Sequence, residues 1–356
     1  MPLGLVINPG STSTKVGVFR DNEPVFVETI RHSQAELANF ASIDAQREFR
    51  LSTVQAVLAS HGVGLKSIDG VIAIGGMLKP GEAGVYKVDE TMVEDLTKGT
   101  YGDHAANLGG IIAWDLARIL GVDAYVADPI TADEMQEVAR LSGHPLFRRE
   151  GRAHTLNQKS VAMTAAKALG KDYAASRLVV AHLGGGISVV AHLGGRMVDT
   201  NNARGEGPFS IDRTGGLNAW ELAKLCFSGK YSRDEVLSML NGNGGVVAYL
   251  GTRSFQEVIA RKNRGDEKAA LVFDSLAYQV AKEIGAMATV LEGDVDAVVL
   301  TGGMANAAEL VDAIRKRVAF IAPVFVYPGE NELEALAEYL RAVLTGETPA
   351  KKYMNA

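Results

Sequence analysis

The sequence predicts an α/β fold built from two related halves. Apolar runs of strand length alternate with helical periodicity in the first half of the 356 residues, and the same rhythm returns after residue 173. One motif occurs twice, at 7–19 and at 181–192, as an apolar run, a short turn of small residues and a second apolar run. Each copy predicts two strands joined by a tight turn, so the repeat favours a duplicated domain.

The first half predicts a sheet that helices cover. Its apolar runs predict strands at 3–8, 14–20, 25–30, 71–74 and 124–127. Helical periodicity runs through 35–61 and 105–120. Strands that alternate with long helices are typical of α/β domains.

The second half repeats this order. Its apolar runs predict strands at 178–182, 187–192, 196–199 and 295–300, with helices through most of 220–290. A glycine-, proline- and arginine-bearing junction places the domain boundary at residue 150, giving an N-terminal domain 1–150 and a C-terminal domain 151–356. The last helix, 332–344, either completes the second domain or returns to the first. The tail after Pro349 is expected to be a frayed end.

Composition favours a cytoplasmic enzyme. Charged residues are 22% of the chain and hydrophobic ones 47%, ordinary values for a globular protein. A net charge of −6 gives no general attraction to nucleic acid or to an anionic membrane. We expect no signal peptide, because no basic segment followed by an apolar core opens the chain, and no apolar stretch reaches membrane-spanning length. Cys226, the one cysteine, is expected to be buried as a small hydrophobe.

The two short turns are candidate phosphate sites. They consist of small residues: Gly10, Ser11, Thr12 and Ser13 in the first, and Gly184, Gly185 and Gly186 in the second. Such turns leave backbone N–H groups to point at an anion, and hydroxyls add donors. Asn8 and His182 take the same place, at the end of the strand before each turn. One glycine turn alone is more often a plain hairpin, whereas two related turns favour a polyphosphate gripped from both sides of a cleft.

A third glycine turn and two charged residues support this interpretation. Gly302 and Gly303 follow the last strand of the second half, where open α/β sheets bind ligands. Lys15, after the first turn, is a candidate to neutralise a phosphate, although a lysine in a strand is more often simply exposed to solvent. Asp128, at a strand end, suits a metal ligand or an orienting carboxylate, with a turn-forming role as the alternative.

Four further residues are candidates. His104 lies at a predicted helix start, where Asp103 would be the N-cap. Arg213 belongs to a long glycine-rich polar loop, a type that is often functional, with a solvated surface loop as the alternative. Glu330 and Glu332 precede the last helix, where they would stabilise its start or one of them would hold a magnesium-bound water.

Several ordered motifs give the chain a family resemblance. They are Ile7-Asn8-Pro9-Gly10-Ser11-Thr12-Ser13-Thr14-Lys15, His154-Thr155-Leu156-Asn157-Gln158-Lys159, Gly205 to Ser210, Cys226-Phe227-Ser228-Gly229-Lys230-Tyr231 and Leu300-Thr301-Gly302-Gly303. In them the chain resembles the acetate and butyrate kinase family, the acetokinase family, and most closely its butyrate kinase branch. The resemblance runs essentially from end to end. It implies two duplicated ribonuclease H-like domains of the type found in actin, sugar kinases and heat-shock ATPases, with a central nucleotide cleft.

The resemblance also implies an activity and a set of residues. The activity is reversible phosphoryl transfer between ATP and butyrate, or another short-chain fatty acid, giving an acyl phosphate and ADP. The implied catalytic residues are Asn8, His104, Asp128, His182 and Arg213. The implied nucleotide-binding residues are Gly10, Ser11, Thr12, Ser13, Lys15, Gly184, Gly185, Gly186, Gly302, Gly303 and Asn306. The implied magnesium residues are Asp128 with Glu330 or Glu332.

Two positions depart from the pattern of that branch. Ile74 stands where butyrate kinases usually carry an arginine, and Gln256 stands where a basic residue is usual. A carboxylate substrate loses much attraction when no cation meets it, since charge-assisted hydrogen bonds are about twice as strong as neutral ones. Lys79, Arg253 or Arg213 would then supply the charge.

Three functions therefore stay open on the sequence. The leading one is a magnesium- and ATP-dependent butyrate kinase, without a covalent enzyme intermediate, in which fixed donors stabilise the transferred phosphoryl group. The second is a nucleotide-binding member that has lost or changed its kinase activity, and the third is a sugar kinase. The expected partners are small molecules, a carboxylate and a nucleotide. The family also implies a homo-oligomer of two or more chains.

Overall fold

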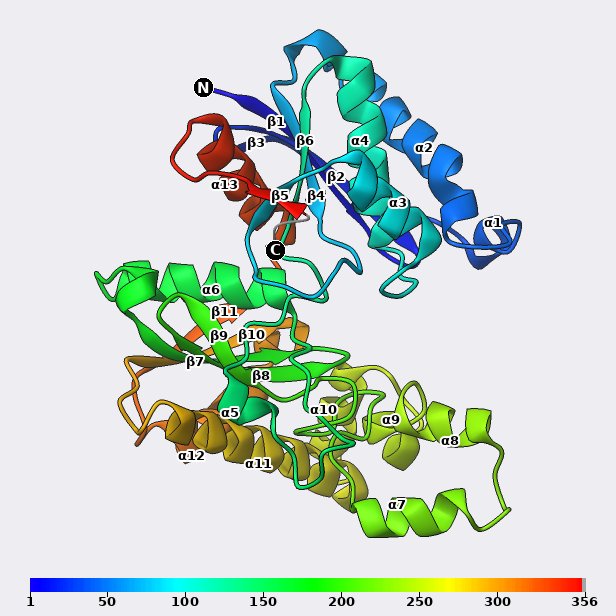
Figure 1. Cartoon of the computed structure of the whole chain (residues 1–356). Helices are drawn as coiled ribbons and strands as arrows, with labels where there is room; N and C mark the ends of the chain where they lie inside the picture. The colour runs from blue at the N-terminus through cyan, green and yellow to red at the C-terminus, as the bar shows by residue number, and fades with distance from the viewer. Residues whose placement is uncertain (354–356) are drawn as a thin grey trace. The chain divides into compact units, whose positions relative to one another are not determined.

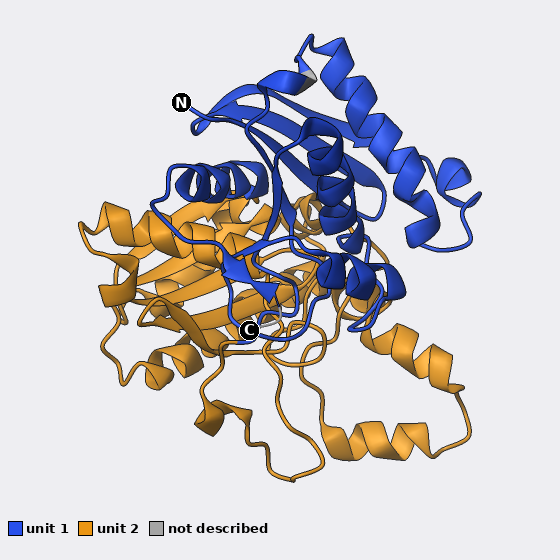
Figure 2. Ribbon diagram, turned by 45° about the horizontal axis from the view of Figure 1, so that its top comes forward, with its two compact units in different colours: residues 1–133, 331–356 blue, residues 134–330 orange. Residues whose placement is uncertain are grey.

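The computed structural model describes residues 1–353. Its contacts divide the chain into two compact units, shown in Figure 2. Unit 1 contains Met1–Asp133 and the chain from Asn331 onward, and unit 2 contains Glu134–Glu330. This division differs from the boundary expected at residue 150, and it places the last helix in unit 1.

The segment 134–150 belongs with unit 2 because its backbone and side chains bind the edge of that unit's sheet. The backbone N–H of Gln136 donates to the carbonyl of Val198 at 3.0 Å. The guanidinium of Arg149 donates to the carbonyl of Thr200 at 2.9 Å. Gly143 and Pro145 lie in a loop within this unit and not at its boundary.

Unit 1 holds a seven-stranded sheet in the order β12-β5-β6-β4-β1-β2-β3 (Figure 1). The strands β1, β2 and β3 are consecutive antiparallel neighbours, whereas β1, β4 and β6 run parallel. The strands are β1 Leu3–Pro9, β2 Ser13–Arg20, β3 Glu23–Arg31, β4 Gly70–Ile74, β5 Val85–Lys87, β6 Asp123–Ala127 and β12 Lys351–Lys352. The helices are α1 Gln34–Leu37, α2 Arg47–Ser60, α3 Glu90–Lys98, α4 Asn107–Leu120 and α13 Glu332–Leu344, with 3₁₀ turns at Asp44–Gln46 and Leu65–Ser67.

Helices cover both faces of this sheet. α4 packs on β4 and β6 and contacts α2 and α3, while α13 packs against β1 and β4. Side chains alternate along β1, so Leu5 and Ile7 enter the core with α2 and α4. Gly4 points the other way, where a Cβ would collide with Leu340 of α13. By the same alternation Asn8 lies on the α13 face.

Unit 2 repeats the central part of this topology. Its five-stranded sheet has the order β11-β10-β7-β8-β9, with β7, β8 and β9 antiparallel in turn and β7, β10 and β11 parallel. The strands are β7 Arg177–Leu183, β8 Ile187–Leu193, β9 Arg196–Thr200, β10 Ala297–Gly302 and β11 Val324–Pro328. This matches the order β6-β4-β1-β2-β3 of unit 1, strand for strand and direction for direction. The predicted α/β fold with an internal duplication is therefore confirmed.

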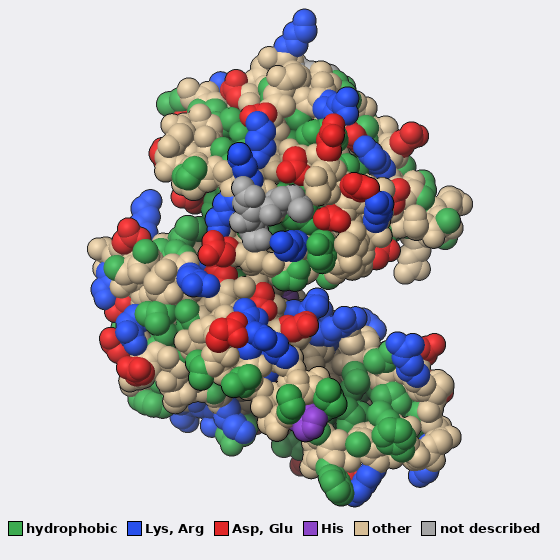
Figure 3. All heavy atoms as spheres, viewed as in Figure 1, with side chains coloured by type: hydrophobic (Ala, Val, Ile, Leu, Met, Phe, Trp, Pro, Cys, Tyr) green, Lys and Arg blue, Asp and Glu red, His purple; other side chains and the backbone are tan. Residues whose placement is uncertain are grey.

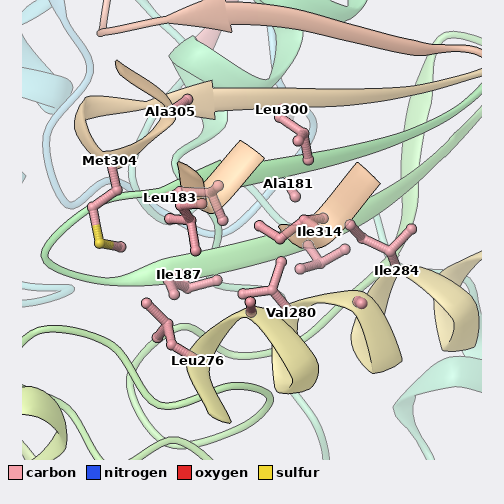
Figure 4. Close-up of a cluster of buried hydrophobic side chains, with 14 of the residues drawn as sticks. Ala181, Leu183, Ile187, Leu276, Val280, Ile284, Leu300, Met304, Ala305 and Ile314 are labelled. Carbon is pink, nitrogen blue, oxygen red and sulfur yellow. The ribbon is translucent and has the colours of Figure 1, made fainter. Parts of the chain in front are cut away.

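Helices also cover both faces of the second sheet. α11 packs on β7 and β8, and α6 packs on β7 and β10 (Figure 1). Figure 4 shows Ala181 and Leu183 on the α11 side, with Leu276 and Val280. His182 lies between the first two in sequence, so it points to α6. The helices are α5 Glu137–Arg140, α6 Thr155–Ala168, α7 Ala219–Cys226, α8 Arg233–Leu240, α9 Gly245–Leu250, α10 Phe255–Asn263, α11 Glu267–Val290 and α12 Ala308–Val318, with 3₁₀ turns at Tyr173–Ala175 and Gly303–Asn306.

Some local expectations were wrong. The helix expected at 35–61 is interrupted between α1 and α2, where the Ser42 hydroxyl accepts from the Ala45 N–H and so competes with helical bonding. Cys226 is exposed, because α7 buries none of its residues. The last predicted strand of unit 2 begins two residues later than expected, at Ala297.

The tail after Pro349 was expected to fray, and its described part does not. β12 pairs with β5, and Tyr353 is buried with its hydroxyl donating to Asp95 Oδ2 at 2.8 Å. The backbone N–H of Lys79 donates to the same hydroxyl at 3.1 Å. A buried aromatic ring with a bonded hydroxyl offsets the entropy of ordering a chain end.

Candidate functional site

The first turn joins β1 to β2 and presents two predicted site residues on neighbouring strands. Asn8 is the register partner of Lys15. The Asn8 amide donates to Glu332 Oε2 at 2.5 Å, and Lys15 Nζ lies 3.6 Å from the same oxygen. Glu332 begins α13, the helix on this face of the sheet. The structure therefore brings Asn8, Lys15 and Glu332 together within unit 1.

Asp128 lies at the carboxyl end of β6, on the same edge of the sheet as Asn8. It is buried and adopts a positive φ of 45°, which costs a non-glycine residue free energy. Its Oδ1 accepts from the Gly84 N–H at 2.8 Å, and its Oδ2 accepts from the Tyr339 hydroxyl at 2.9 Å. Tyr339 belongs to α13, so this one helix contacts both Asn8 and Asp128.

His104 precedes α4 and is exposed. Its Nδ1 accepts from the Ala106 N–H at 3.1 Å. The expected capping by Asp103 was wrong, since the helix begins at Asn107 and its N-cap Ala106 has no side-chain bond. The N–H groups of the first three residues of α4 are instead bonded to the carbonyls of the three residues before the helix.

The second turn joins β7 to β8 and is flanked by His182, which is 1% exposed. His182 Nδ1 lies 2.7 Å from Asn157 Oδ1, and Asn157 is on α6, which covers this face. The Asn157 amide nitrogen donates to the carbonyl of Gly329 at 3.5 Å, which orients the amide oxygen toward the imidazole. His182 Nε2 lies 3.4 Å from Glu330 Oε1. Asn157 therefore fixes a proton on Nδ1 and directs Nε2 outward.

A second histidine supports His182 from behind. The rings of His154 and His182 stack with centroids 3.8 Å apart and planes 12° from parallel. His154 Nδ1 lies 2.9 Å from the Ser188 hydroxyl. Burial lowers the pKa of His154 well below its ordinary value, and the neighbouring His182 and Arg213 lower it further. His154 is therefore a neutral ring at physiological pH.

Arg213 lies against the second turn. A Cβ on Gly186 would overlap its guanidinium, so glycine is required there for the arginine to approach. Its Nη1 donates to the carbonyl of Ala203 at 3.0 Å. Its Nε is buried and has no hydrogen-bond partner in the described part of the chain. Burial lowers the pKa of Arg213, although an arginine stays charged at neutral pH. A buried cationic donor in this state suits an anionic ligand.

The glycine-rich loop that carries Arg213 is anchored to the sheet. Asn201 is buried and accepts from the Val189 N–H at 2.7 Å, and its amide donates to the carbonyl of Ile187 at 3.0 Å. The Ser210 hydroxyl donates to the carbonyl of Gly185 at 2.5 Å. These bonds fix the loop around the turn, which excludes the alternative of a merely solvated surface loop.

The third glycine turn ends β10 on the same edge of the sheet. Gly302 has φ 87°, and a Cβ there would lie 2.6 Å from the carbonyl oxygen of Leu183. Glycine therefore lets the end of β10 approach the end of β7. Gly303 opens a 3₁₀ turn that reaches Asn306, which is exposed and donates to the carbonyl of Gly303 at 3.0 Å.

The two glutamates before the last helix belong to different units. Glu330 accompanies His182 in unit 2, and Glu332 accompanies Asn8 and Lys15 in unit 1. Asn8 and His182, which lie near the ends of β1 and β7, are thus each next to one of these two glutamates. The expectation that both turns face one nucleotide across a cleft stays a prediction.

Sequence reasoning missed three residues that the structure places beside the turns: Arg50, His154 and Asn157. Two of them lie in a motif of the family resemblance to which no role was given. In the structure the first turns of α6 bury several polar residues, Thr155, Asn157, Gln158 and Lys159, which periodicity alone does not indicate. Arg50 sits in an ordinary amphipathic helix and gave no signal of its role.

Within residues 1–353, no group of three or more His, Cys, Asp or Glu residues is arranged to hold a metal ion. None of the helices there combines the length and apolar character needed to cross a bilayer.

Comparisons with known proteins agree with the fold. The model of the acetokinase family matches residues 140–327. Butyrate kinase 2 of Clostridium acetobutylicum is 48% identical over 350 residues, which cover 98% of each chain. Butyrate kinase 1 of the same organism is 47% identical over 350 residues, 98% of this chain and 99% of its own. The crystal structure of Porphyromonas gingivalis acetate kinase aligns with a TM-score of 0.77 at 19% identity, over 96% of this chain and 99% of that one, and so shares the fold.

Proposed function

This chain belongs to the acetokinase family, and we propose that it is a butyrate kinase. The reaction is reversible transfer of the γ-phosphoryl group of ATP to butyrate or another short-chain fatty acid. A carboxylate oxygen forms the new bond to phosphorus, the bond to the bridging oxygen breaks, and ADP leaves. The relatives that match over their full length are named butyrate kinases, which favours this activity over a member that has lost the kinase step.

The observation that carries the proposal is the second turn. A histidine and an arginine, His182 and Arg213, lie against three glycines that place no side chain between them and a ligand. Phosphoryl transfer needs such fixed donors more than it needs covalent chemistry from the protein. The buried Nε of Arg213, without a partner in the described residues, supports an anion as the missing acceptor.

His182 acts in this proposal through its Nε2. A ring that gives its Nδ1–H to Asn157 has a second N–H, on Nε2, only when it is protonated. Glu330 Oε1 lies 3.4 Å from Nε2. The stacked His154 is neutral and adds no repulsion. The Nε2–H would then stabilise the equatorial oxygens of the phosphoryl group in the transition state.

The first turn supplies binding groups in this proposal. Ser11 and Thr12 are exposed and offer hydroxyls and backbone N–H groups to phosphate oxygens. Lys15 adds positive charge from β2, and Asn8 is held in place by Glu332. Gly302, Gly303 and Asn306 would contact the nucleotide from the end of β10.

Magnesium would be held by few protein ligands. Mg²⁺ prefers oxygen donors and usually keeps several waters, with one or two carboxylates and the substrate phosphates completing its shell. Asp128 and Glu332 fit that requirement. Asp128 accepts a hydrogen bond from Tyr339 of α13, and Glu332 is the first residue of the same helix. Glu330 is the alternative to Glu332. Both oxygens of Asp128 accept protein hydrogen bonds, which suits it to orient a magnesium-bound water. When bound, the ion would neutralise charge on the phosphates.

The cation for the carboxylate is assigned to Arg213. Ile74, at the end of β4, supplies none. Arg253 is exposed, its guanidinium lies 2.8 Å from Asp212 Oδ2, and it also donates to the carbonyl of Gly242, so its charge is already balanced. Arg213 is half-buried beside the turn, and its buried Nε has an N–H to give. His104 is kept as a candidate contact to the substrate.

An apolar surface supports assembly into a homo-oligomer. Figure 3 shows hydrophobic side chains gathered over the part of unit 2 that carries α7 to α9. Leu217, Trp220, Phe227 and Leu237 there are 50%, 73%, 92% and 49% exposed. A patch of several large apolar side chains is typical of an interface between chains. We place the enzyme in the cytoplasm, as expected for a kinase that uses ATP and a small organic acid.

The direct test is an assay with butyrate, isobutyrate, propionate and acetate in the presence of ATP and magnesium. Hydroxylamine converts any acyl phosphate into a hydroxamate that can be measured. We expect product with butyrate, in amounts that depend on both ATP and magnesium. No hydroxamate from any of the four acids would overturn the proposed function.

A further inference from the structure

Arg50, on α2, lies beneath the β1–β2 turn and is completely buried. Its Nη1 donates to the carbonyl of Gly10 at 2.9 Å and to the carbonyl of Ser13 at 2.7 Å. Its Nη2 donates to the carbonyl of Ser11 at 3.2 Å, and Nη1 also contacts the Thr14 hydroxyl at 3.1 Å. One guanidinium therefore binds three carbonyls of a single turn from its buried side.

The charge of Arg50 has no carboxylate partner in residues 1–353. Its remaining donors, Nε and Nη2, go to the neutral amide oxygen of Gln46 at 3.1 and 2.9 Å. Arg47, one turn earlier on the same helix, is paired instead with both oxygens of Asp115, at 2.7 and 2.6 Å. Burial lowers the pKa of Arg50, yet an arginine keeps its proton at neutral pH. A buried charge without a counterion is costly and calls for compensation.

The bonds to Arg50 also decide which groups the turn presents outward. The Thr12 carbonyl accepts from the His32 N–H at 2.9 Å, so the carbonyls of Gly10, Ser11, Thr12 and Ser13 are all engaged within the unit. Ser11 and Thr12 are themselves exposed. The Gly10 N–H is itself bound to the Ser13 carbonyl at 2.8 Å, so the hydroxyls and N–H groups of the exposed Ser11 and Thr12 are the donors that the turn offers to an anion.

We propose that Arg50 is a positioning residue of the phosphate site, and that the counterion its buried charge lacks is the polyphosphate bound on the other side of the turn. The inference rests on the proposed function, since it takes ATP as the ligand of this turn. Arg50 touches no ligand itself. It holds the turn in the binding conformation and adds positive potential through one layer of backbone.

The first test removes the guanidinium and compares two arginines of one helix. Arg50→Met should raise the dissociation constant for ATP, measured by calorimetry without butyrate, about tenfold to a hundredfold, as expected for a unit charge several ångströms from an anion at a partly buried site. Arg47→Met is the control, because Arg47 is bound to Asp115 and does not contact the turn. Its ATP affinity should stay within about twofold of wild type. Equal losses in both variants, or none in Arg50→Met, would overturn the proposal.

The second test keeps every hydrogen bond and removes only the imbalance of charge. Gln46→Glu places a carboxylate on the same two donors of Arg50, with nearly the same shape. The variant should melt at or above the wild-type temperature and bind ATP and inorganic pyrophosphate about tenfold more weakly, because an internal counterion now competes with the ligand. Wild-type affinity in a folded Gln46→Glu protein would show that the charge is not reserved for an anion. This variant decides the question if Arg50→Met does not fold.

These measurements separate the inference from the proposed function. A wild-type protein that binds ATP but forms no acyl hydroxamate contradicts the kinase and leaves the Arg50 comparison intact. A wild-type protein that forms hydroxamate, with Arg50→Met and Gln46→Glu binding ATP normally, supports the kinase and overturns the role of Arg50. A wild-type protein that binds neither ATP nor pyrophosphate overturns both.

Discussion

The β1–β2 and β7–β8 turns occupy the same place in two sheets of the same strand order, yet the two units support them from different sides. Arg50 binds the carbonyls of the first turn from its buried side. Arg213 lies against the second turn at Gly186, where a side chain on the turn would displace it. The strand-end residue is a neutral amide, Asn8, in one unit and an imidazole, His182, in the other. Duplication has kept the placement of the turns and changed their chemistry.

This difference indicates a division of labour. At the first turn, the charge of Arg50 is buried, and exposed hydroxyls and Lys15 face the ligand side, which suits ground-state binding of phosphates. At the second turn, His182 suits charge that develops during the reaction, and Arg213 is the cation assigned to the substrate carboxylate. Variants at equivalent positions of the two turns should therefore fail in different ways.

The largest effect is expected at His182. His182→Ala should lower kcat about a hundredfold to a thousandfold, the usual cost of removing one transition-state donor, with little change in the KM for ATP. Asn8→Ala, at the equivalent position of the first turn, should act mainly on the KM for ATP. Steady-state kinetics of both variants, with circular dichroism to verify folding, make the comparison.

Two results would contradict the different roles proposed for the two turns. A folded His182→Ala enzyme that turns over at a rate near wild type would remove the transition-state role of the histidine. The same kcat loss in both variants, with unchanged KM values, would show that the two turns share one role.

Replacing Asn157 by Leu should reproduce part of the His182 effect, because the proton on Nδ1 loses its acceptor.

A smaller effect is expected at Arg213. Arg213→Met should raise the KM for butyrate about tenfold to a hundredfold, since a charge-assisted pair with the carboxylate is lost. Arg253→Met is the matched control, because that guanidinium is exposed and already paired with Asp212. The KM for butyrate in the control should stay close to wild type.

The pair of arginine variants also decides which cation replaces the one missing at Ile74. If Arg253→Met raises the KM for butyrate and Arg213→Met does not, the assignment is reversed. If neither variant raises the KM for butyrate, the next variant to make is Ile74→Arg. A gain in butyrate affinity there would show that the carboxylate site lies beside β4.

The fold could be predicted because its signals are local. Alternation of apolar runs, and a motif written twice, depend on residues near one another in sequence, and both survive in the strand order. The same holds for the strand ends at Asn8 and His182, whose place beside a turn follows from the sequence alone. The wrong expectations, at the split helix before α2 and at the ordered tail, depend on side-chain bonds that periodicity does not encode.

The site could be predicted only in part, because its supporting residues come from distant segments. His182 takes its hydrogen-bond partner from Asn157, 25 positions earlier. Arg50 reaches Gly10 across 40 positions, and Asn8 takes Glu332 across 324. A single sequence shows which residues end the strands, but not which side chains a distant helix will bring to them.

The smallest effect is a difference in acid sensitivity between the two hairpins. Burial lowers the pKa of His192, on β8 at the end of the hairpin far from the second turn, well below its ordinary value of 6.5, and Lys159 lowers it further. Burial also lowers the pKa of His32 beside the first turn, with Arg50 adding to the effect, but the shift is less marked. Above pH 6.5 both rings are neutral in the folded and unfolded chain and contribute no pH dependence.

As the pH falls below 6.5, the unfolded chain binds a proton at each histidine and the folded chain does not, so the free energy of unfolding decreases. For one fully buried histidine the decrease approaches about 1.4 kcal/mol per pH unit. His192→Gln should therefore flatten the loss of stability between pH 6.5 and 5 by up to that amount, and His32→Gln should flatten it less. Urea unfolding at a series of pH values measures both slopes. A larger change for His32→Gln would mean that the first turn, with its buried arginine, is the more acid-sensitive of the two.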